Sequence, residues 1–314
     1  MRVFVAGGSG VLGRRLVPQL VARGHQVTAT TTSGAKLDLL TRLGAEAVVM
    51  DGLDAGSVHA AVAAAAPDVI VHQMTGLSFA HAGKVDLKHP DKYFAATNRL
   101  RVAGTDHLLA AADAAGVTHV VAQSNATGNG PDDDGWTKPE QKPLDTAALP
   151  AAYRLAMEPL GHIEASVINA GGAALRYGWF YGPGTYFGRN GATEADVRRR
   201  RFPVIGKGTG LFSFIHVDAA AAATVAAVQR GAPGVYNIVD DKPAPMREWL
   251  PAYAETIGAK RPLHIPAWLA RLAAGPTASL VSRQPGAANN KAKDTLGWTP
   301  IWPSWQEGFQ HAPR

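Results

Sequence analysis

A glycine motif near the start of the chain constrains the fold more than any other feature. The motif is Gly7-x-x-Gly10-x-x-Gly13. It follows residues 2–6, whose β-branched and aromatic side chains predict a strand, and it overlaps residues 12–23, whose apolar periodicity predicts a helix. A strand, a glycine-rich turn and a helix in this order predict a βαβ unit with parallel strands.

Alternating strand-like and helix-like segments fill the first two-thirds of the chain. Strands are expected at residues 2–6, 25–31, 47–50, 68–73, 117–123 and 173–176, and helices at 12–23, 36–43, 58–66, 93–115 and 152–170. Later segments predict helices at 218–230, 246–257, 266–272 and 277–282 and a strand at 235–239. The fold class is therefore α/β, with a Rossmann-type doubly wound parallel sheet and a small C-terminal region that binds substrate or acts as a lid.

Two domains are expected. Residues 1–183 form the dinucleotide-binding domain, to which later segments return, and residues 184–314 are mainly a substrate-binding and lid region. Residues 125–150 are rich in Gly, Pro and Asp, which predicts a loop and a second lid candidate.

Composition excludes several classes of protein. The 314 residues, 46% of them hydrophobic and 18% charged, suit a packed core. The absence of cysteine excludes a disulfide scaffold, a cysteine-ligated metal and a thiol nucleophile, and the histidines lack metal-ligand spacing, so no metal is expected. No apolar stretch reaches the roughly 20 residues of a membrane span, and no signal peptide precedes the first strand, so we expect a cytoplasmic protein with no membrane partner.

The net charge of +6 is concentrated most strongly in four consecutive arginines at residues 198–201. This segment has no interleaved aromatic residues, and Glu194 and Asp196 lie beside it, so it predicts a solvated helix end rather than a nucleic-acid site. The expected partner is a small-molecule substrate, and the oligomeric state stays open.

The glycine motif predicts a dinucleotide site. Gly7 allows a tight turn, Gly10 lets backbone N–H groups approach a pyrophosphate, and Gly13 lets the helix pack close to the sheet. The residues between the glycines complete the predicted phosphate-binding loop: Ser9, Val11 and Leu12.

The end of the second strand indicates which dinucleotide binds. Proteins that bind NAD place a carboxylate there for the ribose 2′-OH, whereas this chain has Thr31, Thr32 and Ser33. A carboxylate would repel a 2′-phosphate, so its absence favours NADP(H), with charge supplied by Arg14 or Lys36. The alternative is that the threonines are ordinary strand-forming residues.

Further cofactor contacts are expected where the next two strands end. Asp51 and Gly52 follow the third strand, where this kind of fold places a side chain beside the adenine. Gln73, Met74 and Thr75 follow the fourth strand, where the backbone passes the pyrophosphate and ribose.

Several further motifs resemble the extended short-chain dehydrogenase/reductases, in the NAD-dependent epimerase/dehydratase branch. The resemblance covers nearly the whole chain and implies a seven-stranded Rossmann domain and a smaller C-terminal substrate region. The motifs, besides the glycines, are residues 104–112, 175–177, 181–184, 214–218, 235–238 and 296–300. Tyr177, within the second of these, is assigned to the cofactor site.

The catalytic residues of this family are only partly present. The resemblance implies a serine after the fifth strand, which is Ser124, and a Tyr-x-x-x-Lys pair on the next helix. Tyr153 is the candidate proton donor, but Met157 stands where the lysine belongs. The alternative register, set by Glu164, places an alanine and a leucine at the two positions, so the chain is an atypical member without the usual dyad.

Three functions are consistent with an intact cofactor motif beside a missing lysine. The first is NADPH-dependent reduction of a ketone on a bulky aromatic, polyketide-type substrate, as in atypical ketoreductases of angucyclinone antibiotic pathways, with the proton coming from water, Ser124 or a substrate hydroxyl. The second is a nucleotide-sugar epimerase or dehydratase, and the third is a non-catalytic NADP(H)-binding redox sensor.

Aromatic residues favour the first of these functions. Five aromatic side chains between residues 179 and 187 follow the sixth strand, at the sheet edge where such folds bind ligands. A flat apolar ligand suits them better than a sugar nucleotide does. The predicted pocket wall consists of Trp179, Phe180, Tyr181, Tyr186 and Phe187 with Met74, Leu77, Phe79, Trp268 and Leu280.

Overall fold

The structure is a computed structural model, and it describes residues 1–77, 89–126, 137–144, 146, 147, 149–275 and 277–311. Within these residues, seven strands form one parallel sheet in the order β12-β7-β5-β4-β1-β2-β3. The strands are β1 (Arg2–Ala6), β2 (Gln26–Thr31), β3 (Glu46–Val49), β4 (Val69–His72), β5 (Val120–Asn125), β7 (Ala173–Tyr177) and β12 (Gly234–Ile238). The predicted doubly wound sheet is confirmed, and β12 brings a late segment back to it.

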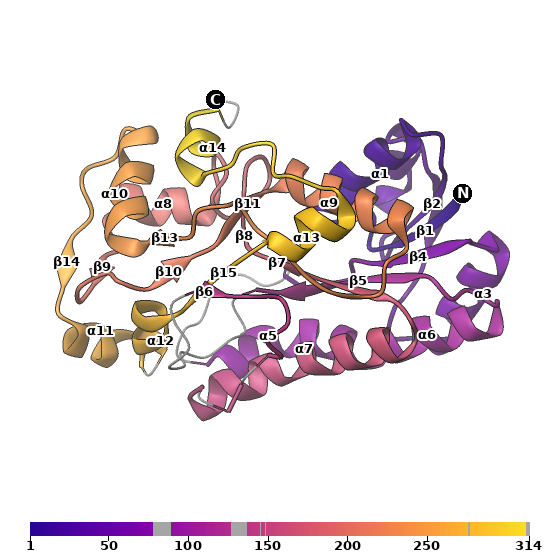
Figure 1. The fold of residues 1–314 in the computed structure, drawn as a ribbon, viewed down its shortest axis with the longest axis horizontal. Coiled ribbons are helices and arrows are strands. Elements are labelled where there is room, and N and C mark those ends of the chain that lie inside the picture. Colours follow the sequence, from indigo (N-terminus) through magenta and orange to yellow (C-terminus); the bar gives the residue numbers. More distant parts are fainter. Residues whose placement is uncertain (78–88, 127–136, 145, 148, 276, 312–314) are drawn as a thin grey trace.

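Helices cover both faces of the sheet (Figure 1). One face carries α1 (Gly13–Val21), α2 (Leu37–Arg42), α9 (Val217–Arg230) and α13 (Asn290–Leu296), and the other carries α3 (Ala55–Ala65), α6 (Thr105–Ala114) and α7 (Ala151–Asn169). The strands have apolar side chains on both faces because both are covered, which explains their nearly continuous hydrophobic sequence. Alanines dominate the buried face of α9, so this helix approaches α1 and the sheet closely.

The helix predicted for residues 93–115 is interrupted. The structure has α5 (Pro90–Arg99), a π-helical turn η2 (Leu100–Gly104) and then α6. The Thr105 hydroxyl donates to the carbonyl of Arg101 at 2.7 Å, so a side chain competes for the backbone acceptor at this point. Hydrophobic periodicity does not distinguish a wide turn from a regular one, and π-turns of this kind recur at functional sites.

The C-terminal part lies beyond one end of the sheet (Figure 1). It has a core of its own that is rich in aromatic side chains. Its helices are α8 (Ala192–Arg198), α10 (Met246–Thr256), α11 (Ala267–Ala274), α12 (Thr277–Arg283) and α14 (Trp305–His311). Its short strands form the pairs β8 (Trp179–Tyr181) with β11 (Phe214–His216), β9 (Val204–Ile205) with β14 (His264–Ile265), and β10 (Leu211–Phe212) with β13 (Ala244–Pro245). The sequence did not predict these strands, α8, α13 or α14, because segments this short carry little periodicity.

The segment at residues 125–150, which was expected to be a loop, contains a short strand. Within it, β6 (Thr137–Lys138) pairs in parallel with β15 (Gly286–Ala287), a segment near the C-terminus. Such a distant partner leaves no local signal in the sequence.

The predicted aromatic wall is wrong in part. Tyr181 and Phe187 are buried in the C-terminal core, where Phe187 packs edge-on against Trp249. Trp179 packs against Phe212 at a ring distance of 5.6 Å. Two members contact the N-terminal part of the chain: Tyr186, whose hydroxyl lies 2.9 Å from that of Tyr93, and Phe180, which packs against the core of the sheet. Phe79 lies outside the described residues. Aromatic residues beside a binding edge serve core packing first, because they have the largest apolar area to bury.

Candidate functional site

The glycine loop between β1 and α1 fits tightly against the end of β4. Gly7 has a φ of +90°, and a Cβ placed on it would lie 2.7 Å from the carbonyl oxygen of Gln73. A Cβ on Gly13 would overlap the backbone of Gly8. The Gly7 amide donates to the Thr30 hydroxyl at 3.0 Å. The loop therefore holds the shape that the glycine spacing predicted, with the start of α1 pressed against the sheet.

The N-terminus of α1 is open toward an anion. Among the described residues no side chain caps this helix, and its first turn contains no acidic residue. The first N–H groups of a helix have no partner within the helix, and the helix dipole makes this end positive. The uncapped end and the glycine loop together form a cradle of the kind that holds a pyrophosphate.

The end of β2 presents hydroxyl groups beside this cradle. Ser9 donates to the Thr31 hydroxyl at 3.1 Å, and Thr31 accepts the Ser33 amide at 3.3 Å. Thr32 is exposed. The structure thus brings the predicted residues Ser9, Thr31, Thr32 and Ser33 together, without a carboxylate in this segment.

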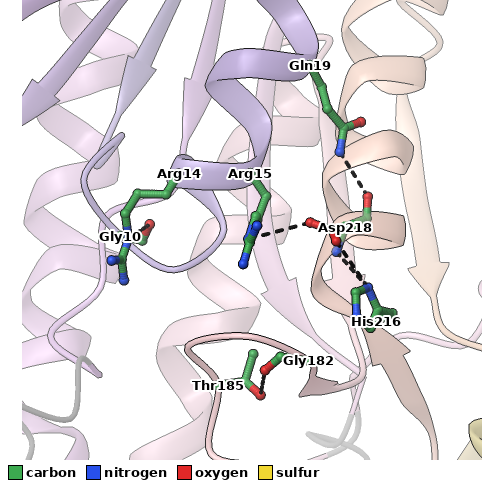
Figure 2. Close-up of polar contacts among 8 residues, drawn as sticks. All are labelled: Gly10, Arg14, Arg15, Gln19, Gly182, Thr185, His216 and Asp218. Atoms are coloured by element: carbon green, nitrogen blue, oxygen red, sulfur yellow. Dashed lines mark hydrogen bonds and ion pairs between the residues drawn. The ribbon is translucent and has the colours of Figure 1, made fainter. Parts of the chain in front are cut away.

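Two neighbouring arginines on α1 have different surroundings (Figure 2). Arg15 pairs with Asp218 at 3.5 Å, next to the bond from Gln19 to the Asp218 carbonyl. Arg14 is exposed and lies beside Gly10, whose carbonyl accepts its Nε at 3.4 Å. In the part of the chain that the structure describes, Arg14 pairs with no carboxylate. Its charge is therefore available to an anion at the glycine loop.

His216 supports the contact between α1 and α9. Its Nδ1 accepts the Asp218 amide at 3.2 Å, which requires this nitrogen to carry no proton. Burial lowers the pKa of His216 to about 4, with Asp218 acting in the opposite direction and Arg15 adding to the decrease. At neutral pH His216 is uncharged, so its approach to the Asp218 carboxylate is not an ion pair.

The predicted residues after β3 and β4 also lie together. The Asp51 carboxylate accepts the Leu53 amide at 2.9 Å. Gly52 lies so close to Met74 that a Cβ would overlap its sulfur. The Met74 carbonyl accepts Gln123 Nε2 at 2.8 Å. Thr75, the next residue of the predicted set, is exposed.

The side chains of Tyr177 and Gln73 form a hydrogen bond at the carboxyl ends of β7 and β4. Gln73 Nε2 donates to the Tyr177 hydroxyl at 3.2 Å, and this hydroxyl lies 2.7 Å from the Thr224 hydroxyl of α9. Burial raises the pKa of Tyr177, so the phenol stays neutral. These contacts fasten the ends of β4 and β7 to α9.

His72 fixes the backbone that leaves β4. Its Nδ1 accepts the Met74 amide at 3.2 Å, and its Nε2 donates to Thr105 at 3.1 Å. Burial, with the nearby charge of Arg101, lowers the pKa of His72 to about 4. The neutral ring satisfies both hydrogen bonds, so His72 positions backbone at the site.

Ser124 is hydrogen-bonded to a buried ion pair. Its hydroxyl donates to Glu164 with 2.6 Å between Oγ and Oε1. The same carboxylate receives Arg176 Nε at 2.7 Å and Nη2 at 2.6 Å, and Arg176 Nη1 donates to the Lys142 carbonyl. The hydroxyl hydrogen of Ser124 is therefore directed at Glu164 and away from any substrate oxygen in this arrangement.

Tyr153 lies on α7 in an apolar environment. It packs with Phe94 and Leu280 around a small cluster that contains Ala156, Met157 and Leu160. Met157 and Leu160 stand where the two registers of the family motif place the lysine. Both residues are buried, as is Ala156. Burial raises the pKa of Tyr153, and the charge of Arg101 acts in the opposite direction.

Sequence reasoning missed Arg101 and the ion pair of Glu164 with Arg176. A usable signal was present for Arg101, which falls on the buried stripe of its helix together with Thr97 and Leu108. A charged residue on such a stripe is unusual enough to mark a site. No group of three or more metal-ligating side chains occurs among the described residues, and none of the helices there is long and apolar enough to cross a membrane.

Known proteins resemble the chain over its whole length. It is 41% identical over 312 residues to 3-diazoavenalumate denitrifying reductase of a Streptomyces species, covering 98% of this chain and 99% of that protein. It is 29% identical over 284 residues to a 4-hydroxy-2-methyl-3-oxo-4-farnesyl-3,4-dihydroquinoline-1-oxide ketoreductase of Stigmatella aurantiaca, covering 87% and 79%.

Solved structures share the fold. The UDP-glucose 4-epimerase of Thermotoga maritima superposes with a TM-score of 0.75 at 21% identity, covering 99% of this chain and 97% of the epimerase. The family model for NAD dependent epimerases and dehydratases matches residues 3–239. The chain is therefore an oxidoreductase that belongs to the NAD dependent epimerase/dehydratase family.

Proposed function

We propose that this protein is an NADPH-dependent reductase that removes a diazo group from an aromatic substrate as dinitrogen. The observation that carries the proposal is the end-to-end similarity, at 41% identity, to a reductase named for this reaction on 3-diazoavenalumate. The site supports it, because the chain has the cofactor loop of its family and lacks the lysine that helps a tyrosine protonate a carbonyl.

The chemistry explains why that lysine is dispensable. When bound, the cofactor supplies a hydride. An aryl diazonium group that gains this hydride loses dinitrogen, and the hydrogen remains on the ring carbon in place of the broken C–N bond. Arene, dinitrogen and oxidised cofactor balance the reaction without a proton from the protein. Reduction of a ketone differs, because the oxygen gains negative charge and requires an acid.

The residues of the chain have binding and orienting roles in this proposal. The loop from Gly7 to Gly13 and the open end of α1 would hold the pyrophosphate, Asp51 and Gly52 would contact the adenine, and Gln73, Met74, Thr75 and Tyr177 would contact the ribose and pyrophosphate. Thr31, Thr32 and Ser33 would favour the 2′-phosphate of NADPH, since no carboxylate of that segment repels it, and Arg14 would add positive charge at the glycine loop.

The test is turnover of 3-diazoavenalumate by the purified protein with NADPH. We expect one dinitrogen released and one NADPH oxidised for each substrate consumed, and a denitrified arene as the product. Dinitrogen release without NADPH oxidation, or no reaction with this compound while a ketone is reduced, contradicts the proposal.

Ketone reduction is the second candidate, and the similarity to a ketoreductase favours it. In that case the proton comes from Tyr153, from water or from a hydroxyl of the substrate. The redox-sensor alternative predicts no NADPH oxidation with either substrate, and the epimerase alternative predicts thermal stabilisation by UDP- or dTDP-sugars.

A further inference from the structure

Arg101 is a buried cation close to the carboxyl end of β4. It lies in the π-turn η2 between α5 and α6, and only 2% of it is exposed. No carboxylate among the described residues pairs with its guanidinium, and its Nε–H has no acceptor there. Arg176, the other buried arginine of this region, is instead paired with Glu164 at 2.6 Å.

The guanidinium is held in a fixed orientation. Its Nη1 donates to Asn98 Oδ1 at 3.0 Å, and Asn98 Nδ2 donates to the carbonyl of Ala156 on α7 at 3.1 Å. The ring of Phe94 lies with its centroid 5.7 Å from the guanidinium carbon. Both ends of the Asn98 amide are engaged, so Arg101 cannot turn without breaking these bonds.

Arg101 also lies close to the carboxyl end of β4. Its carbonyl accepts the Thr105 hydroxyl, and Thr105 in turn accepts the ring N–H of His72. Parallel α/β sheets bind their ligands outside the carboxyl ends of the strands. The side chains next to the guanidinium, Phe94 and Tyr153, are aromatic and partly exposed, so the cation lies behind a surface that suits a flat ring.

The charge persists in this environment. Burial lowers the pKa of Arg101 to about 10, which leaves the group protonated at neutral pH. Arg101 has no counterion in the part of the chain that the structure describes. An unpaired buried charge destabilises a folded protein, and an anion that forms hydrogen bonds with it removes this penalty. A bound ligand can provide such an anion.

We propose that Arg101 binds a carboxylate of the aromatic substrate, with the ring of that substrate against Phe94 and Tyr153. The inference rests on the proposed function for the identity of the reacting group, and on the geometry of Arg101 for the carboxylate. The proposed substrate is therefore an aromatic carboxylic acid. Arg101 is the residue that would distinguish such acids from their neutral analogues.

Calorimetric titration of the NADP+-loaded protein with trans-cinnamate and with methyl trans-cinnamate tests this assignment. We expect the acid to bind about tenfold or more tightly than the ester, as a hydrogen-bonded charge pair provides. Arg101→Met abolishes the preference by weakening the acid alone, and Arg101→Lys retains part of it. Arg99→Met, which removes the same charge from an exposed position two residues away, leaves both affinities unchanged.

The outcomes separate a binding role from a structural one. If Arg101 acts only in binding, we expect the Tm of the Arg101→Met variant to lie within a few degrees of the Tm of the native protein. Equal binding of acid and ester by the native protein, or an acid preference that survives unchanged in the Arg101→Met variant, overturns the proposal. Because the titration needs no turnover, an acid preference without dinitrogen release would reject the proposed reaction while supporting the anion site.

Discussion

The Ser124 hydroxyl donates a hydrogen bond to the Glu164 carboxylate across 2.6 Å, in a pair of residues that lies 40 positions apart in sequence. This bond turns the family serine of β5 toward the buried ion pair between Glu164 of α7 and Arg176 of β7. We expect Ser124→Ala to lower the free energy of unfolding by about 1–3 kcal/mol, because it removes a hydrogen bond to a charged group.

Turnover of the same variant distinguishes two roles of Ser124. If the serine only supports Glu164, kcat with the diazo substrate falls by less than about tenfold, whereas removal of a hydroxyl that stabilises a reacting oxygen typically costs about a hundredfold or more. Tyr153→Phe is the companion measurement. Retained turnover in both variants excludes acid catalysis by these side chains, and a large loss in both favours ketone-type chemistry.

The ion pair of Glu164 with Arg176 is expected to be essential to stability. Glu164→Leu alone leaves the Arg176 guanidinium buried without its counterion, and we expect the free energy of unfolding to fall by about 3–5 kcal/mol. The double variant Glu164→Leu/Arg176→Met removes both charges and is expected to lose less than the single one. Denaturant unfolding of the native protein, both single variants and the double variant measures the coupling, and additive losses would show that the pair is independent.

Gly7 is expected to be essential to the cofactor loop. Gly7→Ala combines a positive φ with a Cβ that meets the Gln73 carbonyl, so the loop must shift. We expect the Kd for NADPH to rise by about tenfold or more, as a loss of at least about 1.4 kcal/mol requires. Gly161→Ala is the matched control, because a Cβ there meets no atom within 4 Å on helix α7, and it is expected to stabilise the protein by up to about 1 kcal/mol.

The two arginines of α1 are expected to act differently on the cofactor. Arg14→Ala removes a cation beside the glycine loop that has no carboxylate partner in the described part of the chain, so the binding of both NADPH and NADH is expected to weaken by about tenfold. Arg15→Ala removes a charge already paired with Asp218 and is expected to change both affinities little. Fluorescence titration measures the four affinities, and tighter binding of NADH than of NADPH by the native protein would contradict the assignment of NADP(H).

Acidification is expected to destabilise the fold through His72. Because its pKa is about 4 in the folded protein, against 6.5 in a free side chain, the unfolded chain takes up the proton first as the pH falls. Stability is constant above pH 6.5 and falls between about pH 6.5 and 4, by up to about 3 kcal/mol for this group. Unfolding curves across this range check the sign. His72→Asn is expected to remove only part of the fall, because burial also lowers the pKa of His216 to about 4 and this group adds a fall of the same sign. A native profile without this fall would show that His72 is not held neutral.

Much of the first domain was predictable because its signals are local. The glycine motif at residues 7–13, the apolar strands and the alanine-rich helices each depend on neighbours in the chain, and each lies where the pattern predicted. The absence of a lysine near Tyr153 is also a property of sequence alone. The pairing of β6 with β15 was not predictable, because it depends on a partner that is far away in the chain. The π-turn before α6 was not predictable, because hydrophobic periodicity does not distinguish a wide turn from a regular one.

The sequence by itself determined the sheet class, the dinucleotide loop and the loss of the family dyad, since these follow from residue type and spacing. Tertiary structure alone decided which polar groups are satisfied. It directed Ser124 at Glu164, placed Tyr181 and Phe187 in the core, and left Arg101 buried without a carboxylate among the described residues. The physical reason is that burial and pairing of a charge depend on side chains that meet from distant parts of the chain, and spacing along one segment carries no record of those partners.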